Sequence, residues 1–244
     1  MENAQLVGLS RQIVLQRELD LIANNVANVD TIGFKAQALL AKEERMSPAS
    51  DLDFRRPDRA ISFVLDDANR YDFSAGTKVT TGNDLDVAVD GPGFFVVQTA
   101  NGERYTRNGS FALSPDGTVV TRDGNPVLTD GGPLVLQANE GRVTIAADGT
   151  VSTTQGVRGK LRVVEFPDTG TLKKVGETLF SGENPQPSTL PRLVQGQIEK
   201  SNVRAVAQIS RLIEVGRAYE AVASWMSKVD EQRRDAIEKL AQVA

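Results

Sequence analysis

The sequence of 244 residues contains no cysteine and no histidine. Without cysteine the chain has no disulfide, thiolate nucleophile or zinc–sulfur site, and the redox compartment stays open. Without histidine it lacks the side chain on which Ser-His catalysis, imidazole proton transfer and most transition-metal sites depend. An enzyme built from this chain would have to use carboxylates, lysine, tyrosine or a serine–lysine pair.

Long hydrophobic runs and basic clusters are also missing. No stretch reaches the roughly 18 consecutive apolar residues of a membrane span, so we expect no direct membrane insertion. Arg11, Arg17, Glu18 and Asp20 interrupt the apolar positions of the first 30 residues, which is not the pattern of a cleaved secretory signal. The net charge of −4 is mild and forms no basic patch, so we expect no nucleic-acid partner.

The N-terminal segment, residues 5–29, is predicted to form a helix with apolar side chains on several sides, and Asn3 is its expected N-cap. Two stripes lie about 140° apart around this helix, and Val14 and Leu21 occupy a third sector. The first stripe comprises Leu6, Leu9 and Ile13, and the second comprises Leu15, Leu19, Ile22, Val26 and Val29. Such a helix must be surrounded, either by a core of its own domain or by neighbouring subunits, and the pattern favours neighbouring subunits.

The C-terminal segment, residues 203–243, repeats apolar residues at 3-4 spacing over more than four heptads, which predicts a coiled coil. The stripe comprises Leu212, Val215, Tyr219, Val222, Met226, Val229, Ala236, Leu240 and Val243. Arg233 is the single break, and Ser201 and Asn202 are the expected caps. About 40 helical residues span roughly 60 Å, which weakens the alternative of a surface helix packed on its own small β domain.

The middle of the chain has the period of short strands from Gly82 onward. Asn-Gly and Asp-Gly dipeptides recur there and predict tight hairpin turns with positive φ at the glycine. They occupy residues 101–102, 108–109, 116–117, 123–124, 130–131 and 148–149. Asp84, Asp86 and Asp90 alternate with apolar residues, so we expect a solvated strand face and not a calcium loop.

These patterns predict an α+β fold with discontinuous N- and C-terminal coiled-coil helices and a central, mostly antiparallel β domain. The expected domains are residues 1–35 with 199–244, a linker or extended segment at 36–81, and the β domain at 82–198. Within the linker, residues 36–45 could instead extend the first helix, and residues 47–57 read as irregular. No catalytic or metal-binding constellation is found.

An asparagine-rich segment, residues 23–35, follows the second stripe. The amides of Asn24, Asn25 and Asn28 can cap backbone groups or bond to an adjacent helix, whereas the plain alternative is a helix stop. Our hypothesis is that these amides bond at a buried helix end and that Gly33 permits a sharp exit toward residue 36.

Four ordered stretches resemble motifs of the axial proteins of the bacterial flagellum, the rod and hook family. They are residues 23–35, 82–95, 105–111, and 197–203 continuing to 217–220. The length resembles a basal-body rod subunit, because hook subunits usually carry large inserted domains. Residues 131–134 and 143–151 are most similar to the proximal-rod type, while the distal-rod type stays the alternative.

The resemblance implies a structural, non-enzymatic subunit without cofactors, in a rod that crosses the periplasm and transmits torque. It implies copies of the chain and other rod proteins as partners, and export by the flagellar export apparatus without a cleaved signal. The family signature residues are Asn24, Asn25, Asn28, Thr31, Gly33, Phe34, Lys35, Ser201 and Asn202. The expected helix interface comprises Leu15, Leu19, Ile22, Val26, Leu212, Val215, Tyr219, Val222, Met226 and Val229.

Two functions of other classes stay open at this point. A non-flagellar coiled-coil assembly protein would share the self-association but lack the asparagine-rich segment. A secreted carboxylate-dependent hydrolase would need two carboxylates that converge in a cleft, and no spacing in the sequence indicates such a pair.

Overall fold

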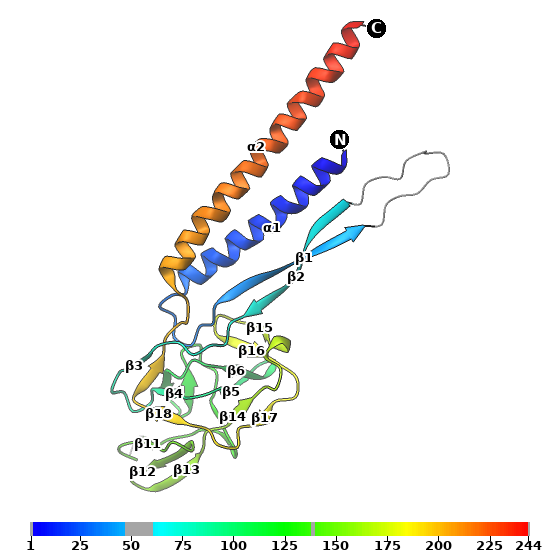
Figure 1. Ribbon diagram of the computed structural model, residues 1–244. Helices are drawn as coiled ribbons and strands as arrows, with labels where there is room; N and C mark the ends of the chain where they lie inside the picture. Colours follow the sequence, from blue (N-terminus) through cyan, green and yellow to red (C-terminus); the bar gives the residue numbers. More distant parts are fainter. Residues whose placement is uncertain (1, 47–60, 138–139, 244) are drawn as a thin grey trace. The chain divides into compact units, whose positions relative to one another are not determined.

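A computed structural model describes residues 2–46, 61–137 and 140–243 of the chain (Figure 1). The chain divides into two compact units, which we describe separately. The helical unit comprises Met1–Val26, Gln37–Arg70 and Arg204–Ala244, and the β unit comprises Ala27–Ala36 and Tyr71–Val203. The α+β fold class predicted from the sequence is confirmed, with one helix near each end of the chain and short antiparallel strands between them.

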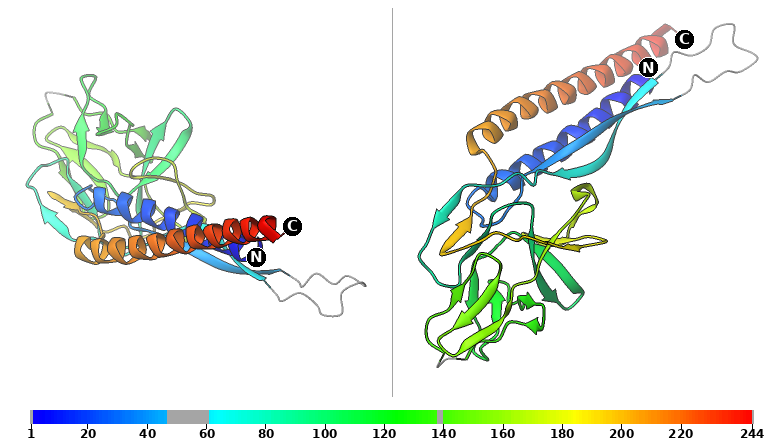
Figure 2. Two further views of the ribbon diagram at one scale, coloured as in Figure 1. Left: turned by 90° about the horizontal axis from the view of Figure 1, so that it is seen from above. Right: turned by 60° about the horizontal axis from the view of Figure 1, so that its bottom comes forward.

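The helical unit contains the two helices and one pair of strands. Its elements are α1 (Glu2–Ala27), β1 (Gln37–Met46), β2 (Ile61–Tyr71) and α2 (Ala205–Val243). The helices lie side by side and run antiparallel, as the views of Figure 2 also show. Gln12 donates to the Tyr219 hydroxyl over 3.1 Å, and farther along α1 the Arg211 guanidinium pairs with Glu18 at 2.6 Å. Residues later in α1 thus contact residues earlier in α2, as antiparallel helices do.

The core of the helical unit is made by the two long stripes. Leu15, Ile22 and Val215 are buried together. Around them pack the partly buried Leu19, Val26, Leu212, Ala218, Tyr219 and Val222. The second stripe of α1 therefore has its partner in α2 of the same chain, and this core is small.

Both predicted helix starts are wrong in detail. Asn3 is not an N-cap, because α1 already begins at Glu2. Ser201 and Asn202 do not cap α2, which begins at Ala205. Their side chains bind elsewhere: the Ser201 hydroxyl accepts from the Val203 amide over 3.2 Å, and Asn202 bonds to residues 36, 72 and 74. Ser201 therefore closes a local turn before the helix, whereas Asn202 binds residues that are far away in the sequence.

The possible extension of the first helix over residues 36–45 is also wrong. Residues Gln37–Met46 form β1, which pairs with β2 in a two-stranded sheet within the segment expected as a linker. The helix cannot continue, since Gly33 has a φ of 70°, in the left-handed region. The expected irregular stretch at residues 47–57 lies outside the described residues.

The β unit is built on a six-stranded antiparallel sheet in the order β15-β16-β6-β5-β14-β17. Its members are β5 (Phe94–Thr99), β6 (Gly102–Thr106), β14 (Val163–Glu165), β15 (Lys173–Lys174), β16 (Leu179–Ser181) and β17 (Gln186–Pro187), with the 3-10 turn η1 (Thr169–Thr171) before β15. The predicted short, antiparallel strands are therefore confirmed, although strands distant in the sequence are neighbours in this sheet.

The remaining strands form small sheets around it. They are β3 (Lys78–Thr80), β4 (Val87–Val89), β7 (Phe111–Leu113), β8 (Val119–Thr121), β9 (Leu128–Thr129), β10 (Gly132–Pro133), β11 (Thr144–Ile145), β12 (Thr150–Thr153), β13 (Gly156–Lys160), β18 (Leu193–Gln195) and β19 (Gln197–Glu199). β19 pairs with β3 and β18 pairs with β4, so the end of the β unit returns to its beginning.

Strand β5 is covered on both faces. Phe95 and Val97 enter one hydrophobic cluster, and Phe94 and Val96 enter the other. The continuous apolar run in the sequence, without the alternation of a half-exposed strand, follows from this double burial. The Phe95 and Phe111 rings meet edge to face with centroids 5.2 Å apart.

The predicted turn chemistry is confirmed in four of the six dipeptides. The glycine has positive φ at Gly102, Gly117, Gly124 and Gly149. At residues 130–131 the positive φ falls one position later, so that prediction is wrong. Gly109 is needed for a different reason: a Cβ there would lie 1.7 Å from the carbonyl oxygen of Val87.

The expectation of a solvated acidic face at residues 84–90 is wrong at Asp86. Val87, Ala88 and Val89 are all buried, and so is Asp86, whose Oδ2 accepts from the Thr81 hydroxyl over 2.6 Å. β18 and the backbone at Gly109 bond to the two edges of this strand, so it is an inner strand with buried side chains. Within the described residues, neither helix has the length and apolar character required to cross a membrane.

We predict that Phe95→Ala lowers the free energy of unfolding of the β unit by about 3–5 kcal/mol, because it leaves a cavity between Phe111 and its neighbours. The measurement is urea unfolding followed by circular dichroism. The exposed Leu190 provides the control, since Leu190→Ala should change the value by less than about 0.5 kcal/mol. Equal effects of the two substitutions would contradict the core assignment.

Candidate functional site

In the helical unit, Asn25 fixes the start of β1. Its Oδ1 accepts from the Gln37 amide over 2.9 Å, and its Nδ2 donates to the Gln37 carbonyl over 2.7 Å. The buried amide thus binds Gln37 as a neighbouring strand would, with one donor and one acceptor. Asn24, the first amide of the segment, is exposed.

In the β unit, residues 28–33 make the turn that follows α1. The Thr31 hydroxyl donates to Oδ1 of Asn28 over 3.0 Å. Gly33 packs so closely that a Cβ would lie 2.3 Å from the Asn108 amide nitrogen, and its own amide donates to the Glu199 carbonyl over 2.8 Å. The turn therefore needs glycine both for its φ and for its packing.

Lys35 lies at the centre of the β unit's most buried polar group. Its ammonium donates to Oε1 of Glu199 over 2.6 Å and to the Ser74 carbonyl over 2.7 Å. Burial lowers the pKa of Lys35 from its ordinary value, and the Glu199 carboxylate acts in the opposite direction. The Gly76 amide also donates to Oε1 of Glu199 over 2.8 Å. This ion pair is buried, and the Lys35 ammonium has two hydrogen-bond acceptors, Glu199 and the Ser74 carbonyl.

Arg107 completes what we call the Lys35–Arg107–Glu199 cluster. Its Nη1 lies 3.5 Å from Oε2 of Glu199, and its guanidinium lies over the Phe94 ring, 4.9 Å from the centroid. Burial lowers the pKa of Arg107, and Glu199 again opposes the shift. All three charged side chains are buried.

The cluster joins four motifs that are far apart in the sequence. Lys35, Arg107, Glu199 and Phe94 each belong to a different one of the four stretches on which the family resemblance rests. Sequence reasoning missed Glu199 and Arg107, because a single charge in a short strand or directly after one has no periodicity. The one signal in the sequence that pointed to them was their position inside two of the four stretches that resemble the family motifs.

Asn202 ties the segment after β19 to the segment after the turn. Its Oδ1 accepts from the Ala36 amide over 2.8 Å, and its Nδ2 donates to the Asp72 carbonyl over 2.7 Å. Phe34 is fully buried, with the Lys174 ammonium 4.2 Å from its ring centroid. The signature residues of the β unit therefore hold the two chain segments adjoining the helices.

The surface of the helical unit divides into three sectors around α1. The second stripe faces α2, and the third sector holds the buried Val14 and Asn25, the latter bound to β1. The first stripe, which we call the α1 open stripe, stays exposed: Leu6, Leu9 and Ile13. A groove of about 630 Å³ runs beside it and is lined by Leu9, Gln12, Ile13, Gln16, Arg17, Asp20, Leu21 and Tyr219.

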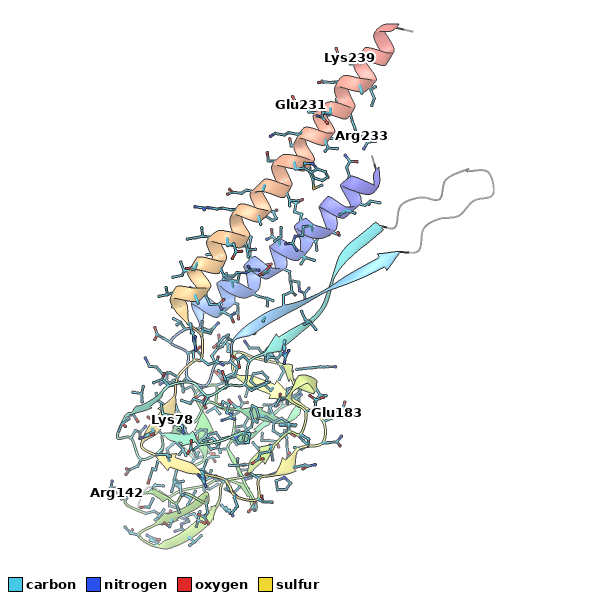
Figure 3. All side chains as sticks on the ribbon, in the orientation of Figure 1. Lys78, Arg142, Glu183, Glu231, Arg233 and Lys239 are labelled. Carbon is cyan, nitrogen blue, oxygen red and sulfur yellow. The ribbon has the colours of Figure 1, made fainter. Side chains whose placement is uncertain are left out.

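A similar stripe lies at the start of α2. It comprises Val206, Ile209 and Ile213, all exposed, and we call it the α2 open stripe. Trp225 and Ile237 add exposed apolar area toward the C-terminus. Figure 3 shows side chains all around α2, with Arg233 labelled; its guanidinium donates to Gln5 of α1. Met226 and Val229 of the predicted interface are partly buried.

Exposed apolar stripes are surfaces for contact with another protein, since a soluble monomer rarely leaves such rows uncovered. No group of three or more potential metal-ligating side chains occurs among the residues that the structure describes. The arrangement can therefore bind protein surfaces through its helices.

Three family models match the chain. They are the flagella basal body rod protein at residues 6–35, the flagellar hook protein FlgE/F/G D1 domain at 88–153, and the flagellar basal body rod FlgEFG protein C-terminal at 194–238. The flagellar basal-body rod protein FlgF of Caulobacter vibrioides is 43% identical, with all of both chains covered.

Two further relatives cover nearly the whole chain. The FlgF protein of Mesorhizobium japonicum is 31% identical over 98% of both chains. The rod protein FlgG of Buchnera aphidicola subsp. Schizaphis graminum is also 31% identical, over 97% of this chain and 96% of its own.

We predict that Glu199→Gln destabilises the β unit by about 3–5 kcal/mol, because it leaves Lys35 and Arg107 buried without a carboxylate. Urea unfolding measures the change. Lys200 offers a matched control one residue away: its pair with Asp30 is exposed at 3.5 Å, so Lys200→Gln should cost no more than about 1 kcal/mol. A loss below 1 kcal/mol for Glu199→Gln would show that the cluster is dispensable.

Proposed function

Because the chain belongs to the flagellar basal-body rod proteins of the FlgF type, we propose that it forms the proximal part of the rod. In this role it is a structural subunit that transmits torque by being packed among other subunits. It reaches the periplasm through the flagellar export apparatus and contacts copies of itself and other rod proteins. The distal-rod alternative is less favoured, since the relatives named FlgG are less similar than the FlgF protein of Caulobacter vibrioides.

The observation that carries the proposal is the exposed apolar surface of the helical unit. Two sectors of α1 are covered within the chain, but Leu6, Leu9 and Ile13 are not. A helix that is apolar on three sides needs a third neighbour, and another subunit would supply it. Heterologous contacts of this kind continue from one copy to the next and generate a helical tube.

The small helical core supports a coupling between assembly and ordering. Only Leu15, Ile22 and Val215 are fully buried in it among the described residues. Fixing the helices costs about 1–2 kcal/mol of backbone entropy per residue, which so small a core offsets poorly. We propose that the helices are only marginally stable in the free monomer and become fully ordered among neighbours in the rod.

The signature residues then have a supporting role. The Lys35–Arg107–Glu199 cluster and Asn202 hold the ends of the segments that leave for α1 and α2. Asn25 directs the chain from α1 into β1. We propose that these residues present the helices for assembly, while the interface residues of α1 and α2 form the helical pair itself.

We predict that the isolated monomer has less helix than the 26 residues of α1 and the 39 residues of α2 together. Far-ultraviolet circular dichroism of the purified chain measures the helix content. The signal should rise toward that of 65 helical residues in trifluoroethanol or on assembly. Full helix content in the dilute monomer would contradict the ordering proposal.

We predict that Val222→Asp or Met226→Asp blocks incorporation into the rod but spares the β unit. A charge placed in the packed face of α2 costs several kcal/mol when it is buried without a partner. Recovery of the chain in purified basal bodies and swimming in soft agar measure the effect. Ser224→Asp is the control, because Ser224 is exposed on the same helix. Normal motility of the two interface variants would count against the assigned face.

A further inference from the structure

The two open stripes lie on one chain, share one spacing and are both exposed. We infer that the α1 open stripe of one copy packs antiparallel against the α2 open stripe of a second copy, with a stagger of about 15 Å along the helices. This inference rests on the proposed function, which it deepens by naming the contacting faces and their offset.

The two stripes match in length and pattern. Leu6, Leu9 and Ile13 are 46–57% exposed, and Val206, Ile209 and Ile213 are 46–79% exposed. Each set has apolar residues separated by three and then four positions, which is the spacing of a helix-to-helix seam. Each stripe lies about 140° around its helix from the face that is used inside the chain.

The stripes lie at opposite ends of the helical pair. Near the α1 open stripe, Gln12 bonds to Tyr219 and Gln5 to Arg233. The α2 open stripe instead lies beside the end of α1, where Arg211 pairs with Glu18. Ile209 is thus level with about residue 23 of α1, some 10 residues beyond Ile13, the residue it faces in the neighbouring copy, or about 15 Å at 1.5 Å per residue.

This offset fixes the geometry of the contact. One copy cannot use both of its stripes on itself, because they are separated along the axis and lie on different helices. When the α1 open stripe of one copy packs against the α2 open stripe of the next, the first copy keeps its α2 open stripe free and the second keeps its α1 open stripe free, so further copies can add at both ends. The contact is heterologous and staggered, so the series does not close into a flat ring.

The antiparallel direction follows from the pair itself. Copies in a polar helical array all point the same way, and α1 is antiparallel to α2 within each copy. α1 of one copy is therefore antiparallel to α2 of its neighbour. In the matching register Leu9 faces Ile213 and Ile13 faces Ile209.

Shape and charge agree with this register. The α1 open stripe borders a groove of about 630 Å³, whereas Val206 is the most protruding residue of the α2 open stripe. Asp20 lines the far end of the groove, and the exposed Arg204 precedes Val206. In the antiparallel register the carboxylate and the guanidinium fall within one helical turn of each other, so opposite charges meet where the stripe ends.

Disulfide cross-linking tests the inference cleanly, because the natural chain has no cysteine. The variant Ile13→Cys/Ile209→Cys, expressed as the full chain in the flagellated host, is treated in purified basal bodies with a mild oxidant. We expect a ladder of disulfide-linked dimers, trimers and higher multimers of this chain. A bond within one copy is excluded, since a disulfide requires Cα atoms about 4.4–6.8 Å apart. Leu9→Cys/Ile213→Cys provides a second pair in the same register.

The controls separate the possible outcomes. Each single variant should stay monomeric, and so should Ile13→Cys/Ile237→Cys, which places the second thiol on an exposed residue outside both stripes. Dimers from a single variant would mean a two-fold contact and overturn the inference. So would incorporation of both pairs without a ladder, or a product that contains a different rod protein. Failure of the cysteine-free chain itself to appear in basal bodies would instead contradict the proposed function.

Discussion

The buried ion pair between Lys35 and Glu199 is the interaction on which the rest of the structure depends. It joins the segment that follows α1 to the strand that precedes α2, across 164 positions of sequence. Removing two charges from water costs several kcal/mol per ion, and only good geometry with further hydrogen bonds offsets that cost. Here Ser74, Gly76 and Arg107 supply those additional partners.

The placement of this pair explains how a chain with distant ends presents two helices. Gly33 turns the backbone, its amide bonds to the Glu199 carbonyl, and Asn202, in the segment between β19 and α2, binds the Ala36 amide. Both helices therefore leave from segments that are bonded to each other inside the β unit. The first residues of α2 and the last residues of α1 are therefore brought close together by the β unit, before the two helices contact each other.

Periodicity predicted the elements of the fold that repeat. The stripes of α1 and α2 carry enough apolar positions to define both helices and the faces that meet, such as Leu15 and Val215. Four of the six Asn-Gly and Asp-Gly turns followed from the conformational freedom of glycine, as at Gly117 and Gly149. These features depend on residues that are close together in the sequence, so the sequence alone is enough to predict them.

Features that depend on distant partners could not be predicted in this way. Glu199 is one acidic residue in a three-residue strand, and only the fold brings it to Lys35. Asp86 alternates with apolar residues as a surface carboxylate does, yet it is buried and accepts a hydrogen bond from the Thr81 hydroxyl. Asn202 has the chemistry of a helix cap, but residues far away in the sequence bind its side chain. The family motifs indicated the importance of these stretches without giving their contacts.

The double burial of β5 has a consequence for the chain before it folds. Phe94, Phe95, Val96 and Val97 form four consecutive apolar residues that both hydrophobic clusters hide in the native state. In an open chain this run is a short, uncharged, β-prone segment of the kind that seeds aggregation. Gly91, Pro92 and Gly93 stand directly before it and disfavour an extension of any intermolecular strand in that direction. The four residues that fill both clusters of the folded subunit are thus prone to aggregation while the chain is unfolded. The Gly-Pro-Gly turn before them opposes that aggregation.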